Sequence, residues 1–238
     1  MEAAGYTTLT RQAGLLREMR LIANNVANAS TTGFRQEGVI FSEYVVRAGD
    51  GPSLSMANGN IGNTSFQQGA LTATGGALDF AIKGDGFFLV ETPRGERLTR
   101  AGTFTTNAVG DLITVDGNRV LDTGGAPIFI PPDAGEIGAA ADGTLSANGR
   151  PLGQIGAVRP AGETELIREG GVIFRADGPL EAAPESQIVR GYLENANVDP
   201  VLQIARMIEV QRAYELGQNF LDAENERVRS ALRSMTRA

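Results

Sequence analysis

The sequence predicts an α+β protein in which long N- and C-terminal helices form an α-helical coiled-coil-like domain and the centre forms a mainly antiparallel β domain. All ten prolines lie between Pro52 and Pro200, and residues 1–30 and 201–238 contain three glycines between them. Apolar residues recur at helical spacing in both terminal segments, whereas the middle combines short apolar runs with Asp-Gly and Asn-Gly turns. Proline and glycine interrupt helices, so the two ends of the chain can form long helices and the middle cannot.

This division predicts four parts along the chain. We expect an N-terminal helix over 1–35, an extended connector over 36–75, the central β domain over 76–190 and a C-terminal helix over 191–238.

The N-terminal segment has two apolar stripes at helical spacing. One stripe consists of Leu15, Met19, Ile22, Val26 and Ala29, and the other of Leu9, Ala13, Leu16, Ala23 and Ala27. One apolar stripe suits a helix lying on its own domain, so two stripes predict a helix with several neighbours. We expect this helix to end near 28–33, where short polar side chains compete for backbone groups and Gly33 can take a positive φ.

Three asparagines, Asn24, Asn25 and Asn28, lie close together near the end of this helix. Asparagine is a mediocre helix former, so three in five residues exceed what a helix cap requires. They mark either a fraying helix end or side-chain amides that hydrogen-bond across a helix–helix or subunit contact and fix its register.

The C-terminal helix is expected to begin at Asp199-Pro200, an N-cap residue followed by proline at the first helical position. A helix of about 35 residues would be roughly 50 Å long at 1.5 Å per residue. Its apolar residues cover more than one stripe, so burial inside a single 25.0 kDa globule is difficult. Its natural partner is another long helix, from this chain and then from other chains.

The apolar and amide side chains on these helices form the predicted assembly interface. They are Leu9, Leu15, Leu16, Met19, Ile22, Asn24, Asn25, Val26, Asn28, Ile204, Met207, Ile208, Val210, Gln211, Tyr214, Leu221, Val228 and Met235.

The middle of the chain has the pattern of short antiparallel strands. Residues 78–82 alternate, 87–90 are a short apolar run, and 112–115 are β-branched and aliphatic. Asp-Gly and Asn-Gly pairs, which hairpin turns prefer, separate such runs. The glycines expected at structural turns are Gly33, Gly84, Gly86, Gly102 and Gly117. Gly84-Asp85-Gly86 is followed by a strand-like run and not by a helix, so it predicts a hairpin turn in preference to a phosphate loop.

Composition excludes several classes of function. The chain has no histidine and no cysteine, so a thiolate nucleophile, a disulfide framework, a zinc finger and an imidazole base are all excluded. We expect no catalytic residue, cofactor or metal. The net charge of -7 argues against nucleic acid as a partner. No window approaches 18 uninterrupted apolar residues, which argues against membrane insertion and a cleaved signal peptide.

Three groups of residues resemble, in order, the motifs of a known family. They are Leu21–Phe34 (LIANNVANASTTGF); Phe80–Val90 (FAIKGDGFFLV) with Thr99–Phe104 (TRAGTF) and Gly110–Leu112; and Glu194–Asp199 (ENANVD) with Met207–Glu215 (MIEVQRAYE). These stretches resemble the N-terminal, central and C-terminal motifs of the axial proteins of the bacterial flagellum, the rod and hook family.

The resemblance implies a structural subunit of the flagellar basal-body rod, the drive shaft that transmits torque from the motor to the hook. It implies helical self-association through an inner tube of terminal helices, and contacts with proximal-rod and distal-rod subunits. It further implies a location in the rod within the periplasm, reached through the flagellar type III export apparatus without a cleaved signal peptide.

Alternatives stay open within and outside this family. The short chain, the start at Glu2–Tyr6 and the ending at Glu224–Arg229 favour one type of rod protein, and a distal-rod or hook-type subunit is the alternative. Outside the family, a surface β-domain glycan-binding protein with helical multimerisation ends would share the glycine-rich middle. It should show exposed aromatics, yet aromatics are only 6% of the residues. A carboxylate hydrolase acting on peptidoglycan is a weaker alternative.

Overall fold

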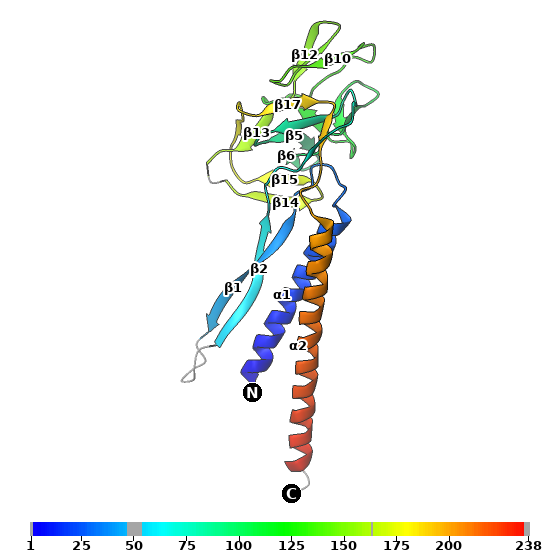
Figure 1. Ribbon diagram of the computed structural model, residues 1–238. Helices are drawn as coiled ribbons and strands as arrows, with labels where there is room; N and C mark the ends of the chain where they lie inside the picture. The colour runs from blue at the N-terminus through cyan, green and yellow to red at the C-terminus, as the bar shows by residue number, and fades with distance from the viewer. Residues whose placement is uncertain (1, 47–53, 163, 236–238) are drawn as a thin grey trace. The chain divides into compact units, whose positions relative to one another are not determined.

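The computed structural model describes residues 2–46, 54–162 and 164–235 (Figure 1). The described residues form two compact units. We call residues 2–27, 36–65 and 199–235 the helical unit, and residues 28–35 and 66–198 the β unit, in both cases within the described ranges.

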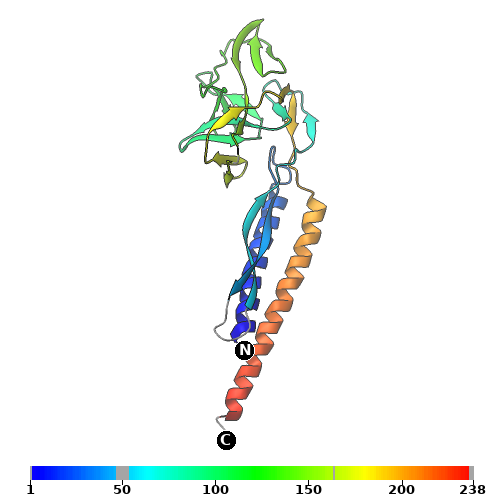
Figure 2. The same cartoon turned by 90° about the vertical axis from the view of Figure 1, so that its left-hand side faces the viewer.

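The helical unit contains two helices and a β-hairpin. Helix α1 spans Glu2–Ala27 and helix α2 spans Pro200–Met235. Strands β1 (Glu37–Val46) and β2 (Leu54–Thr64) pair antiparallel, with a shift of register between Ile40 and Phe41. Helix α1 packs against α2 and against both strands, as the two views of the ribbon show (Figure 1, Figure 2).

The prediction of an α-helical coiled-coil-like domain is wrong. The described part of this unit holds only two helices, and α1 has the hairpin as a second neighbour. Its apolar core is short, with Leu15, Ile22 and Val210 as its buried members. A coiled coil needs an apolar seam sustained over several heptads. Buried amides interrupt the seam here, so the helices form a short mixed contact instead.

Residues 36–75, expected as an extended connector, include this hairpin and strand β3 (Leu71–Ala73). Pairing of β1 with β2 runs from Glu37 opposite Thr64 to Val46 opposite Leu54. The segment lacks the regular apolar alternation that signals a strand with one buried face, which is why the sequence did not reveal it. Residues 47–53 of the connector lie outside the described residues.

Both helix ends next to the β unit follow the local sequence signals. Helix α1 ends at Ala27, and Gly33, a few residues further on, has φ +69°, which glycine adopts without steric cost. At the start of α2 the amides of Val201 and Leu202 donate to Asp199 Oδ1 at 2.9 and 3.1 Å. Asp199 is therefore the N-cap, with Pro200 at the first helical position.

The β unit consists of short strands, all paired antiparallel. They are β3 and β4 (Phe80–Lys83), β5 (Phe87–Thr92), β6 (Gly95–Thr99), β7 (Phe104–Thr106), β8 (Leu112–Thr114), β9 (Arg119–Leu121), β10 (Ile137–Ala139), β11 (Thr144–Ala147), β12 (Arg150–Gln154), β13 (Ala157–Pro160), β14 (Leu166–Gly170), β15 (Ile173–Ala176), β16 (Leu180–Ala182), β17 (Gln187–Arg190) and β18 (Tyr192–Glu194).

One sheet of nine strands organises this unit. Its path is β14-β15-β6-β5-β9-β8-β7, and β13 joins it by pairing with β5 and with β16. Smaller sheets add β10-β11-β12, β17-β4 and β18-β3. The larger core cluster gathers Phe80, Phe88, Leu112 and Leu145, and a second cluster is built around Phe87, Leu98 and Phe174. The predicted central, mainly antiparallel β domain is confirmed.

The predicted turn glycines serve two physical purposes. Gly33, Gly84, Gly86 and Gly117 have positive φ. Gly102 does not, but a Cβ built there would lie 1.7 Å from the carbonyl oxygen of Phe80. Gly102 therefore allows two backbones to approach each other, which is a packing requirement and not a turn requirement.

Candidate assembly interface

Helices α1 and α2 contact each other along an apolar stripe of each. Leu15 and Ile22 of α1 are buried with Val210 of α2, and Met19, Val26, Met207, Ala213 and Tyr214 pack around them. The hydrogen-bonded pairs across the contact are Gln12 with Tyr214, Glu18 with Arg206 and Asn25 with Gln203. Because the partner number falls along α2 as it rises along α1, the two helices are antiparallel.

Asn25 is the polar centre of the helical unit. Its side chain is 1% exposed, and its Nδ2 donates to Glu37 O at 2.7 Å and to Gln203 Oε1 at 3.1 Å. Its Oδ1 accepts from Glu37 N at 2.9 Å. One buried amide thus joins α1, the start of β1 and α2. Since an amide satisfied in this way fits only one alignment, Asn25 fixes the register of the three elements.

A second amide contact lies nearer the start of α1. Gln12 Nε2 donates to the backbone carbonyl of Tyr214 at 2.9 Å. A Cβ added to Gly217 would lie 2.1 Å from this Nε2. The glycine in the middle of α2 therefore makes room for the glutamine of α1, which offsets the low helix propensity of glycine.

An ion pair joins Glu18 of α1 to Arg206 of α2. Arg206 Nε donates to Glu18 Oε1 at 2.7 Å, and Arg206 also pairs with Glu209 on its own helix at 3.1 Å. The hydrogen bond with Glu18 raises the pKa of Arg206 above its ordinary value. Glu18 is nearly buried whereas Arg206 is about half exposed. The pair therefore contributes to alignment more than to stability.

The predicted interface residues divide between this contact and the solvent. Those in the α1–α2 contact are Leu15, Met19, Ile22, Asn25, Val26, Met207, Val210 and Tyr214. Those exposed in the chain are Leu9, Leu16, Asn24, Ile204, Ile208, Gln211, Val228 and Met235. Leu221 is half-buried on α2, and Asn28 is half-buried in the β unit.

The exposed apolar residues of α2 form a face of their own. Val201, Ile204, Ile208, Leu216 and Phe220 are 75%, 52%, 46%, 70% and 48% exposed. At 100° per residue Val201, Ile204, Ile208 and Leu216 lie within about 60° of the point opposite Val210. Phe220 lies about 80° from Val210, beside the contact with α1. A largely apolar hollow of about 380 Å³ lies between the helices beside it, with Gly217 and Phe220 in its lining.

The apolar stripe of α2 also continues where α1 no longer covers it. In both views α2 runs past the N-terminal end of α1 (Figure 1, Figure 2). Val228, Leu232 and Met235 repeat the spacing of the covered stripe, and all three are exposed.

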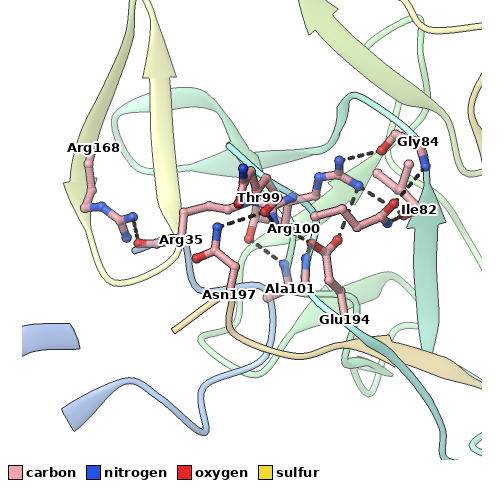
Figure 3. A network of polar contacts seen from close by, with 12 residues as sticks. Arg35, Ile82, Gly84, Thr99, Arg100, Ala101, Arg168, Glu194 and Asn197 are labelled. Atoms are coloured by element: carbon pink, nitrogen blue, oxygen red, sulfur yellow. Dashed lines mark hydrogen bonds and ion pairs between the residues drawn. The ribbon is translucent and has the colours of Figure 1, made fainter. Parts of the chain in front are cut away.

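Sequence reasoning missed the polar partners inside both units. Gln12 lies between Leu9 and Leu15 at helical spacing, and both sequence neighbours of Gln203 are apolar, which is a weak signal that the two glutamines are buried. It also missed a buried group of three charged residues in the β unit, which we call the Glu194 cluster: Arg35, Arg100 and Glu194 (Figure 3).

Glu194 forms ion pairs with both arginines of this cluster. Its Oε1 lies 2.6 Å from Arg35 Nη1 and its Oε2 lies 3.3 Å from Arg100 Nη1. The side chains of Arg35 and Glu194 are 1% and 0% exposed. Burial lowers the pKa of Arg35, and lowers that of Arg100 to about 10, while the charge of Glu194 opposes both shifts. Glu194 therefore keeps two buried guanidinium groups compatible with the fold.

Two findings concern possible metal and membrane sites. Within the residues that the structure describes, no group of three or more acidic side chains is placed to hold a metal ion. In the same residues, neither helix combines the length and the apolar content that a membrane crossing requires.

Three protein families match consecutive parts of the chain. Residues 6–35 match the family "Flagella basal body rod protein", and residues 81–147 match "Flagellar hook protein FlgE/F/G D1 domain". Residues 189–234 match "Flagellar basal body rod FlgEFG protein C-terminal". The first and third matches fall mainly on α1 and α2, and the second falls within the β unit.

Curated proteins match nearly the whole chain. The flagellar basal-body rod protein FlgF of Caulobacter vibrioides is 39% identical, covering 98% of this chain and 97% of the relative. FlgF of Mesorhizobium japonicum is 40% identical over 90% of each chain. The flagellar basal-body rod protein FlgG of Bacillus subtilis is 31% identical, covering 93% of this chain and 94% of its own. The chain therefore belongs to the family of flagellar basal-body rod proteins.

Proposed function

We propose that this protein is a structural subunit of the flagellar basal-body rod, of the FlgF type. The observation that carries the proposal is the exposed apolar face of α2, on a helix already anchored to α1 along its other side. A subunit of a shaft needs such a face, because it must be held by neighbours in addition to its own fold. FlgF relatives at 39% and 40% identity favour this type over the FlgG relative at 31%.

The helical unit supplies the contacts between subunits. Within one copy α1 and α2 pair, and the residues left exposed, such as Leu9 and Ile208, pack against neighbouring copies or other rod subunits. A face that contacts a different face of the next copy generates an open helical assembly and not a closed ring. Torque then passes through many packed helices at once.

The resemblance to flagellar axial proteins supports a proposal for export and location. The subunit passes through the flagellar type III export apparatus without a cleaved signal peptide and assembles into the rod within the periplasm. Its helical ends are largely disordered in the free monomer, since their exposed apolar faces leave the helices marginal until neighbours cover them. A circular dichroism spectrum of the purified monomer that already shows two long helices would overturn this order of events.

Proline at an exposed helix position tests the assembly role. Leu16→Pro and Ile208→Pro each remove a helical hydrogen bond and introduce a clash, at a cost of about 3 kcal/mol or more. Both variants should abolish rod assembly and motility, while the β unit keeps its strand signal in circular dichroism. The matched variants Leu16→Ala and Ile208→Ala preserve the helix and should lose less motility. Normal swimming in the proline variants would contradict the proposal.

The Asn25 amide provides a second prediction. Asn25→Ala leaves the amide of Glu37 and the side-chain oxygen of Gln203 without this buried partner, which costs about 2–3 kcal/mol. Isolated basal bodies carrying the variant should dissociate at a lower temperature than the wild type in a heat-stability assay. Asn63→Ala is the control, because Asn63 is an exposed amide of β2 in the same unit and is not among the predicted interface residues. Equal heat stability of the two variants would count against the role of Asn25.

A further inference from the structure

The Glu194 cluster lies where the chain leaves the β unit. The chain passes between its two units after residues 27, 35, 65 and 198. Arg35 is the last residue before one passage, Gln67 follows another closely, and Asn197 comes just before the last. The cluster and its neighbours therefore include residues next to three of the points at which the chain passes between the units.

Backbone contacts tie three of these segments together within the β unit. Gly33 N donates to Glu194 O at 2.7 Å, and Gly69 N donates to Glu194 Oε1 at 3.0 Å. Arg35 and Asn197 both donate from their side chains to Gln67 O. These hydrogen bonds therefore connect three segments directly to one another: 28–35, 66–69 and 194–197.

The segments next to the two helices also contact each other directly. Asn197 N donates to Phe34 O at 3.2 Å. Arg168 of β14 also contacts this region, since its side chain donates a hydrogen bond to Arg35 O. Its guanidinium lies 4.7 Å from the ring centres of Phe34 and Phe174. The labelled residues come from separate segments of the chain, and Arg35, Arg100 and Glu194 lie among them (Figure 3).

We propose that the Glu194 cluster is a clamp that folds with the β unit and holds the chain leading from α1 beside the chain leading into α2, before the helices pack. This inference rests on the proposed function, in which the helices form only during assembly. Because of the clamp, α1 pairs with α2 of the same copy. The pairing begins at the end of the helices where Asn25 is hydrogen-bonded to Gln203.

Chain entropy explains the value of such a clamp. Residues 35 and 194 are far apart in sequence, so bringing α1 and α2 together in an open chain would require closing a long loop. The folded β unit has already closed it. Pairing then proceeds at a high effective concentration, and α1 of one copy is less available to α2 of another.

Buried charge makes the clamp selective for one arrangement. A shifted segment 28–35 would leave Glu194 or Arg35 buried without its partner, which is strongly unfavourable. An apolar contact would tolerate such a shift more easily. The cluster therefore sets the position at which the chain leaves the β unit toward each helix.

Hydrogen exchange of the full-length monomer, followed by mass spectrometry, tests the clamp. Peptides covering 28–35, 66–70 and 194–198 should be protected as strongly as a core peptide covering 110–121. In Glu194→Gln the exchange of the three clamp peptides should speed up by a factor at least about ten times larger than that of the core peptide. Glu181→Gln is the matched control, because Glu181 forms a half-exposed pair with Arg159 in the same unit, and it should change none of these rates.

Two results would overturn the clamp. The first is rapid exchange of the clamp peptides in the wild type while the core peptide is protected. The second is unchanged protection of the clamp peptides in Glu194→Gln. If the core peptide of Glu194→Gln loses its protection to the same degree as the clamp peptides, the variant Arg35→Lys provides the test. Lysine keeps the positive charge, but its side chain is shorter and reaches Glu194 and Gln67 less well. Faster exchange confined to the clamp peptides in Arg35→Lys supports the proposal, and unchanged exchange overturns it. None of these results depends on whether the wild type occupies the rod, which localisation of the tagged protein in basal bodies tests separately.

Discussion

Replacing Glu194 by alanine is expected to lower the free energy of unfolding of the β unit by about 3–5 kcal/mol. Glu194 is fully buried, and its carboxylate is the acidic partner of both Arg35 and Arg100 in the cluster. Truncation leaves two guanidinium groups in the protein interior without that partner. It also removes the acceptor of the Gly69 amide.

Calorimetry of the purified protein measures this effect. For a unit of this size the loss corresponds to a fall in melting temperature of about 10–20 °C. Glu181→Ala is the control, because its pair with Arg159 is half exposed and exposed pairs contribute about 1 kcal/mol or less. A Glu194→Ala protein that melts within a few degrees of the wild type would show that the cluster is not a source of stability.

Replacing Gly102 by alanine is expected to destabilise the β unit by about 3 kcal/mol or more, at the upper end of the range for overpacking. The added methyl group would lie 1.7 Å from Phe80 O and 3.2 Å from Phe88 Cε2. Rotating a side chain cannot relieve the first clash, because the carbonyl belongs to the backbone. Phe80 N also donates to Gly102 O at 2.9 Å, so separating the two chains breaks a hydrogen bond.

Urea unfolding, followed by circular dichroism in the strand region, provides the measurement for Gly102→Ala. The matched control is Gly153→Ala, where the new methyl group would meet Ile128 Cγ2 at an ordinary 3.6 Å. The midpoint should fall clearly for Gly102→Ala and stay near the wild-type value for Gly153→Ala. Equal midpoints for the two variants would contradict the close backbone approach.

Local signals in the sequence were sufficient where a residue acts on its own neighbourhood. Asp199-Pro200 predicted the start of α2, and the end of α1 before Gly33 followed from short polar residues and glycine. Asp116-Gly117 and Asp142-Gly143 join paired strands, as the turn signals predicted. The hairpin turn predicted at Gly84-Asp85-Gly86 is wrong, because this turn joins β4 to β5, and β4 pairs with β17.

Pairings between distant residues could not be found in this way. Arg35 and Glu194 look like solvated charges in the sequence, and only the fold brings them together in the interior. The hairpin β1–β2 was hidden because its strands lack regular apolar alternation. The two stripes of α1 correctly indicated several neighbours, yet the pattern could not say that one neighbour is a hairpin of the same chain.

The exposed faces of the helices are the central claim of this account, and photo-crosslinking in cells tests them most directly. A photoreactive amino acid would replace Leu9 or Met235, which are 54% and 76% exposed. The control is Leu15, which is buried against α2 in the same chain. Probes at Leu9 and Met235 should crosslink to other copies of this chain or to other rod subunits, whereas the probe at Leu15 should crosslink within the chain. Probes at Leu9 and Met235 that find no rod subunit in motile cells would contradict the account.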